Sequence, residues 1–168
     1  DFFDGDLPWL KLSDIGPADS ESARIVSDSS EMITAEAAAS KPGMALVPSG
    51  RLLLSFKLTI GRVARAGAAL YTNEAIVALR PKSAPPGTDL WLSDEVLEVL
   101  LRRVGSRLLG VDQLGDKKFG RTLNLRALKK LRVPVFSTTG SAEILAIDRD
   151  PVLSPSEKAT KLRELLWN

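Results

Sequence analysis

The sequence from residue 52 to residue 79 reads LLLSFKLTIGRVARAGAALYTNEAIVAL, and its two ends decide the predicted fold. Residues 52–56 and 75–79 are short apolar runs bounded by turn residues, which is typical of buried strands. Between them we expect a polar loop. Rigid strands that present cations, hydroxyls and amides on a loop are suited to binding a polyanion and reading hydrogen-bonding edges. The side chains of this kind in the loop are Lys57, Thr59, Arg62, Arg65, Tyr71, Thr72 and Asn73.

The segments on either side of this stretch predict further short elements. We expect a strand at residues 9–12, an acidic solvated loop at 17–31, a short helix within 32–41 and a strand with a turn at 46–50. Ser93 is a typical N-cap for a helix over 93–104 that ends at Gly105, and Asn124 for a helix over 125–131.

The end of the chain predicts two closing strands and a helix. Residues 133–136 and 143–147 have strand character on either side of a turn at 138–141. Ser154 and Glu157 form a capping box for an amphipathic helix. We therefore expect an α/β or α+β fold, with a curved mixed β-sheet, flanking helices and a short C-terminal helix. Residues 1–150 would form one domain, and 151–168 a connector and helix.

Composition excludes several classes of function. The chain of 168 residues has neither Cys nor His, which excludes thiol nucleophiles, Ser-His-Asp triads and ordinary zinc sites. No glycine pattern indicates a nucleotide or methyl-donor pocket, so we predict no cofactor, no metal and no catalytic residue. There is no signal peptide and no apolar run of about 18 residues, so we expect a cytoplasmic protein without a membrane segment.

Charge is distributed unevenly along the chain. Residues 1–40 hold two basic and nine acidic residues, whereas residues 102–132 hold ten basic and two acidic ones. A basic segment of this kind is typical of surfaces that bind nucleic acid. Its glycine-punctuated loop at 115–122 supplies the candidate contacts Lys117, Lys118 and Arg121. We explain Arg102 and Arg103 instead by the dipole of the preceding helix.

Several blocks of the sequence together resemble the DNA target-recognition domain of type I restriction-modification specificity subunits. The blocks follow one another in the family's order across residues 7–135, which is more specific than any single block. They are LPWLKLSDI at residues 7–15, LSFKLTIGRVA at 54–64, TNEAI at 72–76, GRTLN at 120–124 and VPV at 133–135.

The resemblance implies a non-catalytic module that binds double-stranded DNA and directs an adenine methyltransferase to its site. The partners it implies are a methyltransferase subunit or fused methyltransferase domain, a restriction subunit, and a second copy paired through the C-terminal helix. Loop side chains would contact phosphates and base edges in the major groove. The DNA-binding candidates are Lys57, Thr59, Arg62, Tyr71, Asn73, Lys117, Lys118 and Arg121. We assign Gly61 to the backbone of the turn.

Two other classes of function stay open. The chain could be an interaction scaffold for methyltransferase and nuclease subunits that does not select DNA itself. It could also be a Mg²⁺-dependent nuclease that uses Asp116 and Lys118. One acid-x-Lys match of this kind is expected by chance in a chain with this composition, so it adds no support.

Overall fold

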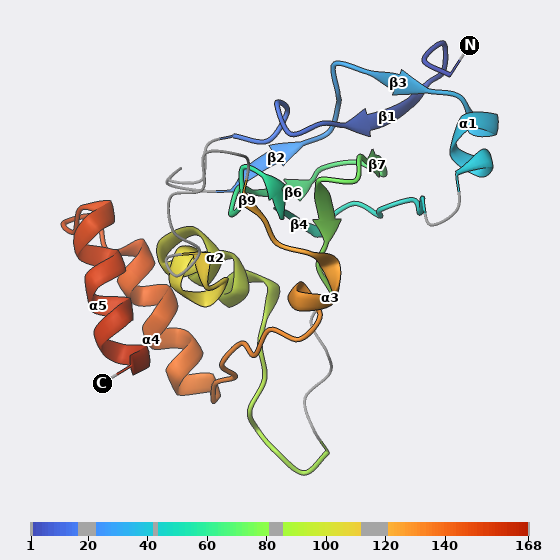
Figure 1. Ribbon diagram of the computed structural model, residues 1–168. Helices are drawn as coiled ribbons and strands as arrows, with labels where there is room; N and C mark the ends of the chain where they lie inside the picture. Colours follow the sequence, from blue (N-terminus) through green and yellow to red (C-terminus); the bar gives the residue numbers. More distant parts are fainter. Residues whose placement is uncertain (1, 17–22, 42–43, 81–85, 112–120, 168) are drawn as a thin grey trace.

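The centre of the fold is a hairpin of two antiparallel strands, β4 (Leu52–Ser55) and β6 (Val63–Ala66). The computed structural model describes residues 2–16, 23–41, 44–80, 86–111 and 121–167 (Figure 1). β8 (Ile76–Ala78) pairs antiparallel with β4, and β2 (Arg24–Val26) pairs parallel with β6. The resulting mixed sheet has the order β2-β6-β4-β8. The two strands predicted at residues 52–56 and 75–79 are therefore confirmed; β4 is buried throughout, whereas in β8 only Ile76 is buried and the other two residues are half-buried.

A second mixed sheet and a short strand pair complete the β structure of the described residues. In the second sheet, β1 (Leu7–Leu10) lies antiparallel to β3 (Met32–Ile33) and parallel to β7 (Tyr71–Thr72). The pair consists of β5 (Lys57–Leu58) and β9 (Arg121–Thr122). The predicted mixture of helices and strands is confirmed, but the strands divide between two mixed sheets instead of forming one.

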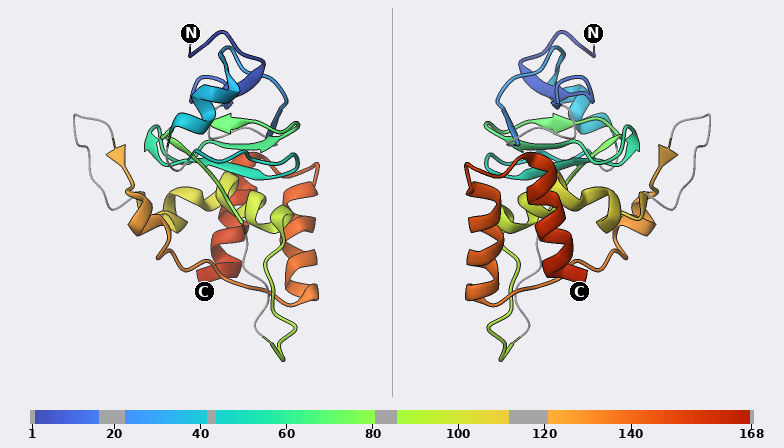
Figure 2. Two further views of the ribbon diagram at one scale, coloured as in Figure 1. Left: turned by 90° about the vertical axis from the view of Figure 1, so that its right-hand side faces the viewer. Right: turned by 90° about the vertical axis from the view of Figure 1, so that its left-hand side faces the viewer.

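Five helices lie in the described part of the chain. Three of them, α2, α4 and α5, gather beyond one face of the four-stranded sheet, at the opposite end of the molecule from β1 and β3 (Figure 2). The helices are α1 (Ala35–Ser40), α2 (Asp94–Leu108), α3 (Leu125–Leu128), α4 (Thr138–Arg149) and α5 (Pro155–Trp167). None of the described helices combines the length and apolar character that crossing a membrane requires.

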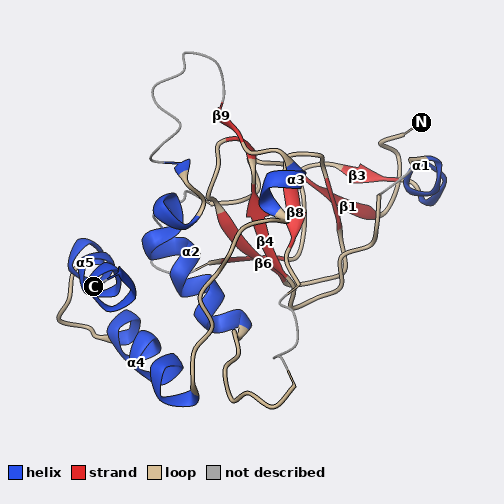
Figure 3. Ribbon diagram, turned by 60° about the horizontal axis from the view of Figure 1, so that its bottom comes forward, coloured by secondary structure: helices blue, strands red, loops and turns tan. Residues whose placement is uncertain are grey.

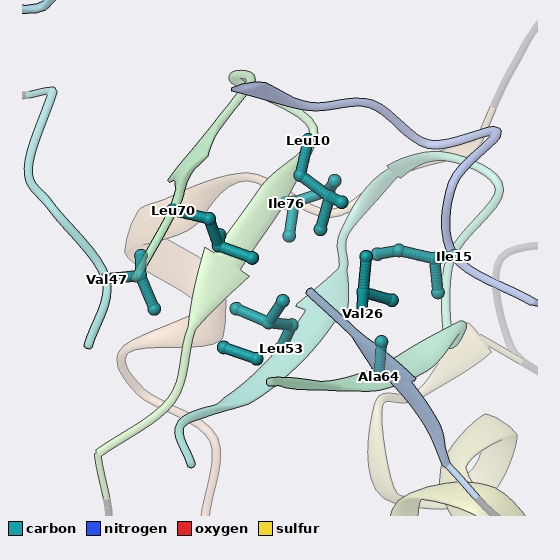
Figure 4. Close-up of a cluster of buried hydrophobic side chains, with 9 residues drawn as sticks. Leu10, Ile15, Val26, Val47, Leu53, Ala64, Leu70 and Ile76 are labelled. Atoms are coloured by element: carbon teal, nitrogen blue, oxygen red, sulfur yellow. The ribbon is translucent and has the colours of Figure 1, made fainter. Parts of the chain in front are cut away.

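The strand β4 is buried on both faces because its side chains alternate between two clusters. Leu53 joins a cluster that includes Leu10 of β1 and Ile76 of β8, and this cluster fills the space beside the second sheet (Figure 4). Leu52 and Leu54 join another cluster with side chains of α2. This arrangement explains why β4 begins with three consecutive leucines and does not alternate polar and apolar residues.

The helix α2 lies between the sheet and the other two long helices (Figure 3). Leu97 and Leu101 pack against the side of the sheet that carries Leu52 and Leu54. Leu100, on the other side of α2, packs with Ile144 of α4 and Leu162 of α5. α2 therefore uses two apolar faces, and both are needed to connect the sheet with the α4–α5 pair.

Ser93 caps α2 as predicted, since its side chain accepts a hydrogen bond from the backbone N–H of Val96. The predicted end of this helix at Gly105 is wrong. The backbone leaves helical geometry at Val104, with φ −131° and ψ 17°, and the helix then continues to Leu108. A glycine inside a helix can thus mark a kink as well as an end.

The predicted strand at 143–147 is also wrong, because residues 138–149 form the helix α4. The helix begins at a cap just before the predicted turn at 138–141. Ser137 accepts a hydrogen bond from the backbone N–H of Gly140 at 3.2 Å and caps the helix. The short apolar run Ile144–Ile147 has no periodicity of its own that separates a strand from a helix turn. Of the predicted strand at 133–136, Phe136 alone forms a bridge, with Trp91.

Two predicted loops contain strands. Residues 57–74 include β6, which has the sequence VARA. Because its alanines are small, the sequence does not show a clear alternation of apolar and polar residues. Ala64 is fully buried among the core side chains of the sheets. The described part of the predicted acidic loop at 17–31 includes β2, where Val26 is buried. Both strands are short and depend on pairing with each other, which a single segment of sequence does not show.

The C-terminal helix packs on the rest of the fold. Ser154 and Glu157 form the predicted capping box, in which the backbone N–H of Ser154 donates to the Glu157 carboxylate at 2.8 Å. Leu162 is fully buried against α2 and α4. The Arg107 guanidinium lies over the Trp167 ring, 4.3 Å from its centroid. These contacts connect α5 to α2 along the length of the helix.

Candidate nucleic-acid interface

The loop of the β4–β6 hairpin is held in one conformation by Ser55. This side chain is fully buried, donates to the backbone carbonyl of Thr59 and accepts a hydrogen bond from the backbone N–H of Arg62 at 2.9 Å. Gly61 has φ +94°, a conformation that glycine adopts readily, so it serves the backbone as predicted. Residues 56–61 therefore form a fixed loop.

The loop pairs with a strand from the basic segment of the chain. In the β5–β9 pair, Lys57 lies opposite Thr122 and Leu58 opposite Arg121. The backbone N–H of Leu123 also donates to the carbonyl of Phe56 at 2.9 Å. The structure thus places two regions that were predicted separately next to each other. Lys117 and Lys118 lie outside the described residues.

A groove of about 770 Å³ lies beside this strand pair. Its apolar surface comes from side chains of the sheets and of the segment after α1, with Leu125 of α3 at one side. Glu74 is the only acidic residue among the described residues that line it. The polar or charged side chains of the lining are Lys41, Lys57, Thr72, Asn73, Glu74 and Asn124.

The two lysines of the groove contact aromatic rings and not carboxylates. The Lys57 ammonium group lies 5.8 Å from the centroid of the Phe56 ring, and that of Lys41 lies 4.5 Å from the Phe2 ring. Among the described residues, no acidic oxygen lies within ion-pair distance of either lysine. Their charge is therefore available to an anionic ligand.

The two asparagines of the groove are oriented by their own backbone. Asn73 accepts a hydrogen bond from the N–H of Ala75 at 3.1 Å through Oδ1, and Asn124 caps α3 by accepting from Ala127 at 2.7 Å. Neither Nδ2 group has a hydrogen-bond partner among the described residues. With Oδ1 engaged, each amide offers donors to the acceptors of a ligand.

The remaining predicted residues have different surroundings. Thr59 is exposed on the hairpin loop. Tyr71 is half-buried in β7 and packs on the cluster of Ile33 and α1. Arg62 is half-buried, and its guanidinium donates to the backbone carbonyls of Leu12 and Ile15 at 3.1 and 3.3 Å. Arg62 therefore connects the hairpin to the N-terminal segment, and we leave it out of the interface.

Other arginines are engaged in ion pairs between β6, α2 and α4. Arg65 pairs with Glu98, while Arg102 and Arg103 both pair with Asp148 of α4, at 2.9 and 2.7 Å. Burial opposes ionisation of Asp148, but the hydrogen bonds and charges of Arg103 and Arg102 outweigh it and hold the pKa of this carboxyl below its ordinary value. The predicted helix-dipole role of Arg102 and Arg103 is wrong, because α2 continues to Leu108 and neither arginine lies in its last turn.

Lys41 and Leu58 are not among the residues predicted for this region, and Asn124 was predicted as a helix cap ahead of a base contact. Lys41 follows a short helix and lacks a motif of its own, so nothing in the sequence indicates that it lines the same groove as Lys57. The described residues contain no group of three acidic side chains that could hold a metal ion. Hydrogen-bond donors predominate among the polar side chains that line the groove.

Comparison with known proteins gives no identification: the chain matches no protein-family model and no curated protein.

Proposed function

We propose that the chain is a DNA-binding module that selects the site at which an adenine methyltransferase acts. The observation that carries the proposal is the β5–β9 pair. It places Lys57 and the end of the basic segment next to a groove whose lysines and amide donors have no acidic or acceptor partners among the described residues.

The chemistry of the groove matches duplex DNA. Ammonium groups attract phosphates and set the position of the protein on the backbone. Amide donors suit the acceptors that dominate the major-groove edges, such as guanine N7 and O6 or thymine O4. The fixed hairpin loop between β4 and β6 would carry Lys57 without an ordering cost for its backbone on binding.

The methyltransferase part of the proposal rests on the sequence resemblance to type I specificity subunits. We infer that the module is not catalytic and acts through a partner subunit or a fused methyltransferase domain, with a restriction subunit as a further partner. The exposed apolar side chain of Leu165 on α5 is available for such an assembly or for pairing with a second copy.

Selection from a random-sequence duplex pool tests the proposal directly. We expect the chain to enrich a short motif without Mg²⁺ or methyl donor, and to bind it less tightly as the salt concentration rises. Reversing the charge of Lys41 and Lys57 to Glu should lower the affinity at least about tenfold at low salt.

A matched double variant separates the effect of charge at the groove from the effect of the protein's net charge. Lys161 and Arg163 are exposed on α5, away from the groove lining, and reversing both to Glu changes the net charge equally. If this control lowers affinity as much as the groove variant, the groove is not the binding site. Absence of any DNA binding, with methyltransferase binding retained, would favour the scaffold. Cleavage of DNA only with Mg²⁺ would favour the nuclease.

A further inference from the structure

Leu58 has an unusual backbone and an unusual exposure for a leucine. It is the only non-glycine residue with positive φ in the described part of the chain, at +61°. Its side chain is 66% exposed. Leucine rarely adopts this left-handed conformation because its Cβ crowds the carbonyl oxygen that follows, whereas Asn and Gly tolerate it.

The folded chain alone does not explain a leucine at this position. The exposed side chain recovers little of the hydrophobic stabilisation that a buried leucine provides. The backbone conformation is imposed on it by the β5–β9 pair on one side and by the Ser55 and Gly61 hydrogen bonds of the hairpin loop on the other. Strained residues held in this way occur preferentially at binding sites.

The surroundings of Leu58 indicate the ligand that its side chain meets. Lys57 and Thr59 flank it, and Arg121 is its partner in the β5–β9 register. An apolar side chain between a cationic and a hydroxyl-bearing neighbour in the sequence suits a ligand that offers an apolar group among anions. In duplex DNA that group is the 5-methyl of thymine, which lies in the major groove between the phosphate backbones.

We propose that Leu58 contacts the 5-methyl group of a thymine and makes the module specific for an A·T pair at one position of its site. This inference rests on the proposed DNA-binding function. The fixed backbone places the Leu58 side chain at one position, so the contact concerns one base pair and not the average composition of the site.

Replacing thymine by uracil isolates this contact, because uracil lacks only the methyl group. In the motif selected by the wild-type chain, each thymine is replaced in turn. We expect one replacement to weaken binding roughly fourfold, which corresponds to burial of about one methyl group. In Leu58→Ala the thymine and uracil duplexes should bind equally at that position, while the other positions behave as in the wild type.

Two further variants keep the test interpretable. Leu58→Asn suits the left-handed backbone, so we expect it to raise the unfolding temperature by about 2 °C and to lose the thymine preference. Val152→Ala truncates another exposed apolar side chain, remote in sequence on the α4–α5 connector, and should keep the preference.

The results that would contradict the Leu58 contact differ from those that would contradict the proposed DNA-binding function. A chain that selects no motif fails as a DNA-binding module, and the Leu58 contact fails with it. A chain that binds a motif without thymine, or whose uracil sensitivity persists in Leu58→Ala, overturns the Leu58 contact alone. A bend in the DNA that depends on Leu58 would also overturn it, because it would indicate insertion between base steps instead.

Discussion

Two groups of cations in this protein have opposite surroundings. Arg102 and Arg103 lie between α2 and α4, where their side chains are 4% exposed and both bind Asp148. Lys41 and Lys57 line the groove beside the β5–β9 pair and contact aromatic rings. The first group contributes to the packing of the helices, and the second remains available to a ligand. The number of basic residues in a segment therefore does not measure its binding surface.

Asp148→Asn gives the largest effect that we expect. It removes the carboxylate shared by the two buried arginines, and breaking a buried ion pair from one side is strongly destabilising. The free energy of unfolding should fall by about 3 kcal/mol, as measured by chemical denaturation. The matched control is Arg149→Gln, whose partner Glu95 is as exposed as Arg149 itself. This control should change stability by less than about 0.5 kcal/mol. Equal effects would contradict the comparison.

Acid should weaken the same contact without a mutation. The pKa of Asp148 is lower in the folded chain than in the unfolded chain, so the folded state favours the ionised carboxyl. Its contribution is complete above the ordinary carboxyl pKa and is lost as the pH falls through the lowered pKa of the folded state. Denaturation curves across this range should therefore show a steeper loss of stability for the wild type than for Asp148→Asn. Parallel curves would exclude Asp148 as the cause.

Arg62→Met tests whether a predicted DNA contact is structural. The substitution keeps the apolar stem and removes the donors to the carbonyls of Leu12 and Ile15. We expect a loss of about 2 kcal/mol in stability, because charged hydrogen bonds disappear and both acceptors are left unpaired. The DNA affinity of the folded protein should be unchanged. If Arg62→Met has normal stability but binds DNA less tightly, Arg62 is a DNA contact and not a structural residue.

Lys41→Gln together with Lys57→Gln should have a smaller effect on stability than Asp148→Asn or Arg62→Met. Each lysine loses only a cation–π contact, so the change should be about 1 kcal/mol or less. DNA binding should weaken. A plot of the logarithm of the binding constant against the logarithm of the salt concentration should become less steep by about two. Titrations at several salt concentrations measure this slope. An unchanged slope would show that neither lysine neutralises a phosphate.

The sequence alone was sufficient to predict the features that depend on residues close to one another in the chain. The runs at 52–56 and 75–79 predict β4 and β8 because an apolar segment bounded by turn residues must be buried. Ser93, Asn124 and Ser154 predict helix starts because a cap and the N–H it accepts lie within three residues of each other. Gly61 predicts a positive φ for the same local reason. Each of these assignments concerns atoms within one turn of the chain.

Only the tertiary structure decided the features that depend on distant residues. Asp148 reaches Arg102 and Arg103 across more than 40 positions of sequence, and this contact reassigns both arginines. The run at 143–147 has apolar residues for either a strand or a helix, and packing of Ile144 against α2 decides for the helix. The pairing of β5 with β9 places Lys57 opposite Thr122 and Leu58 opposite Arg121, and it holds Leu58 in its exposed conformation. Local chemistry specifies where elements begin, whereas the availability of a side chain depends on what the rest of the chain places next to it.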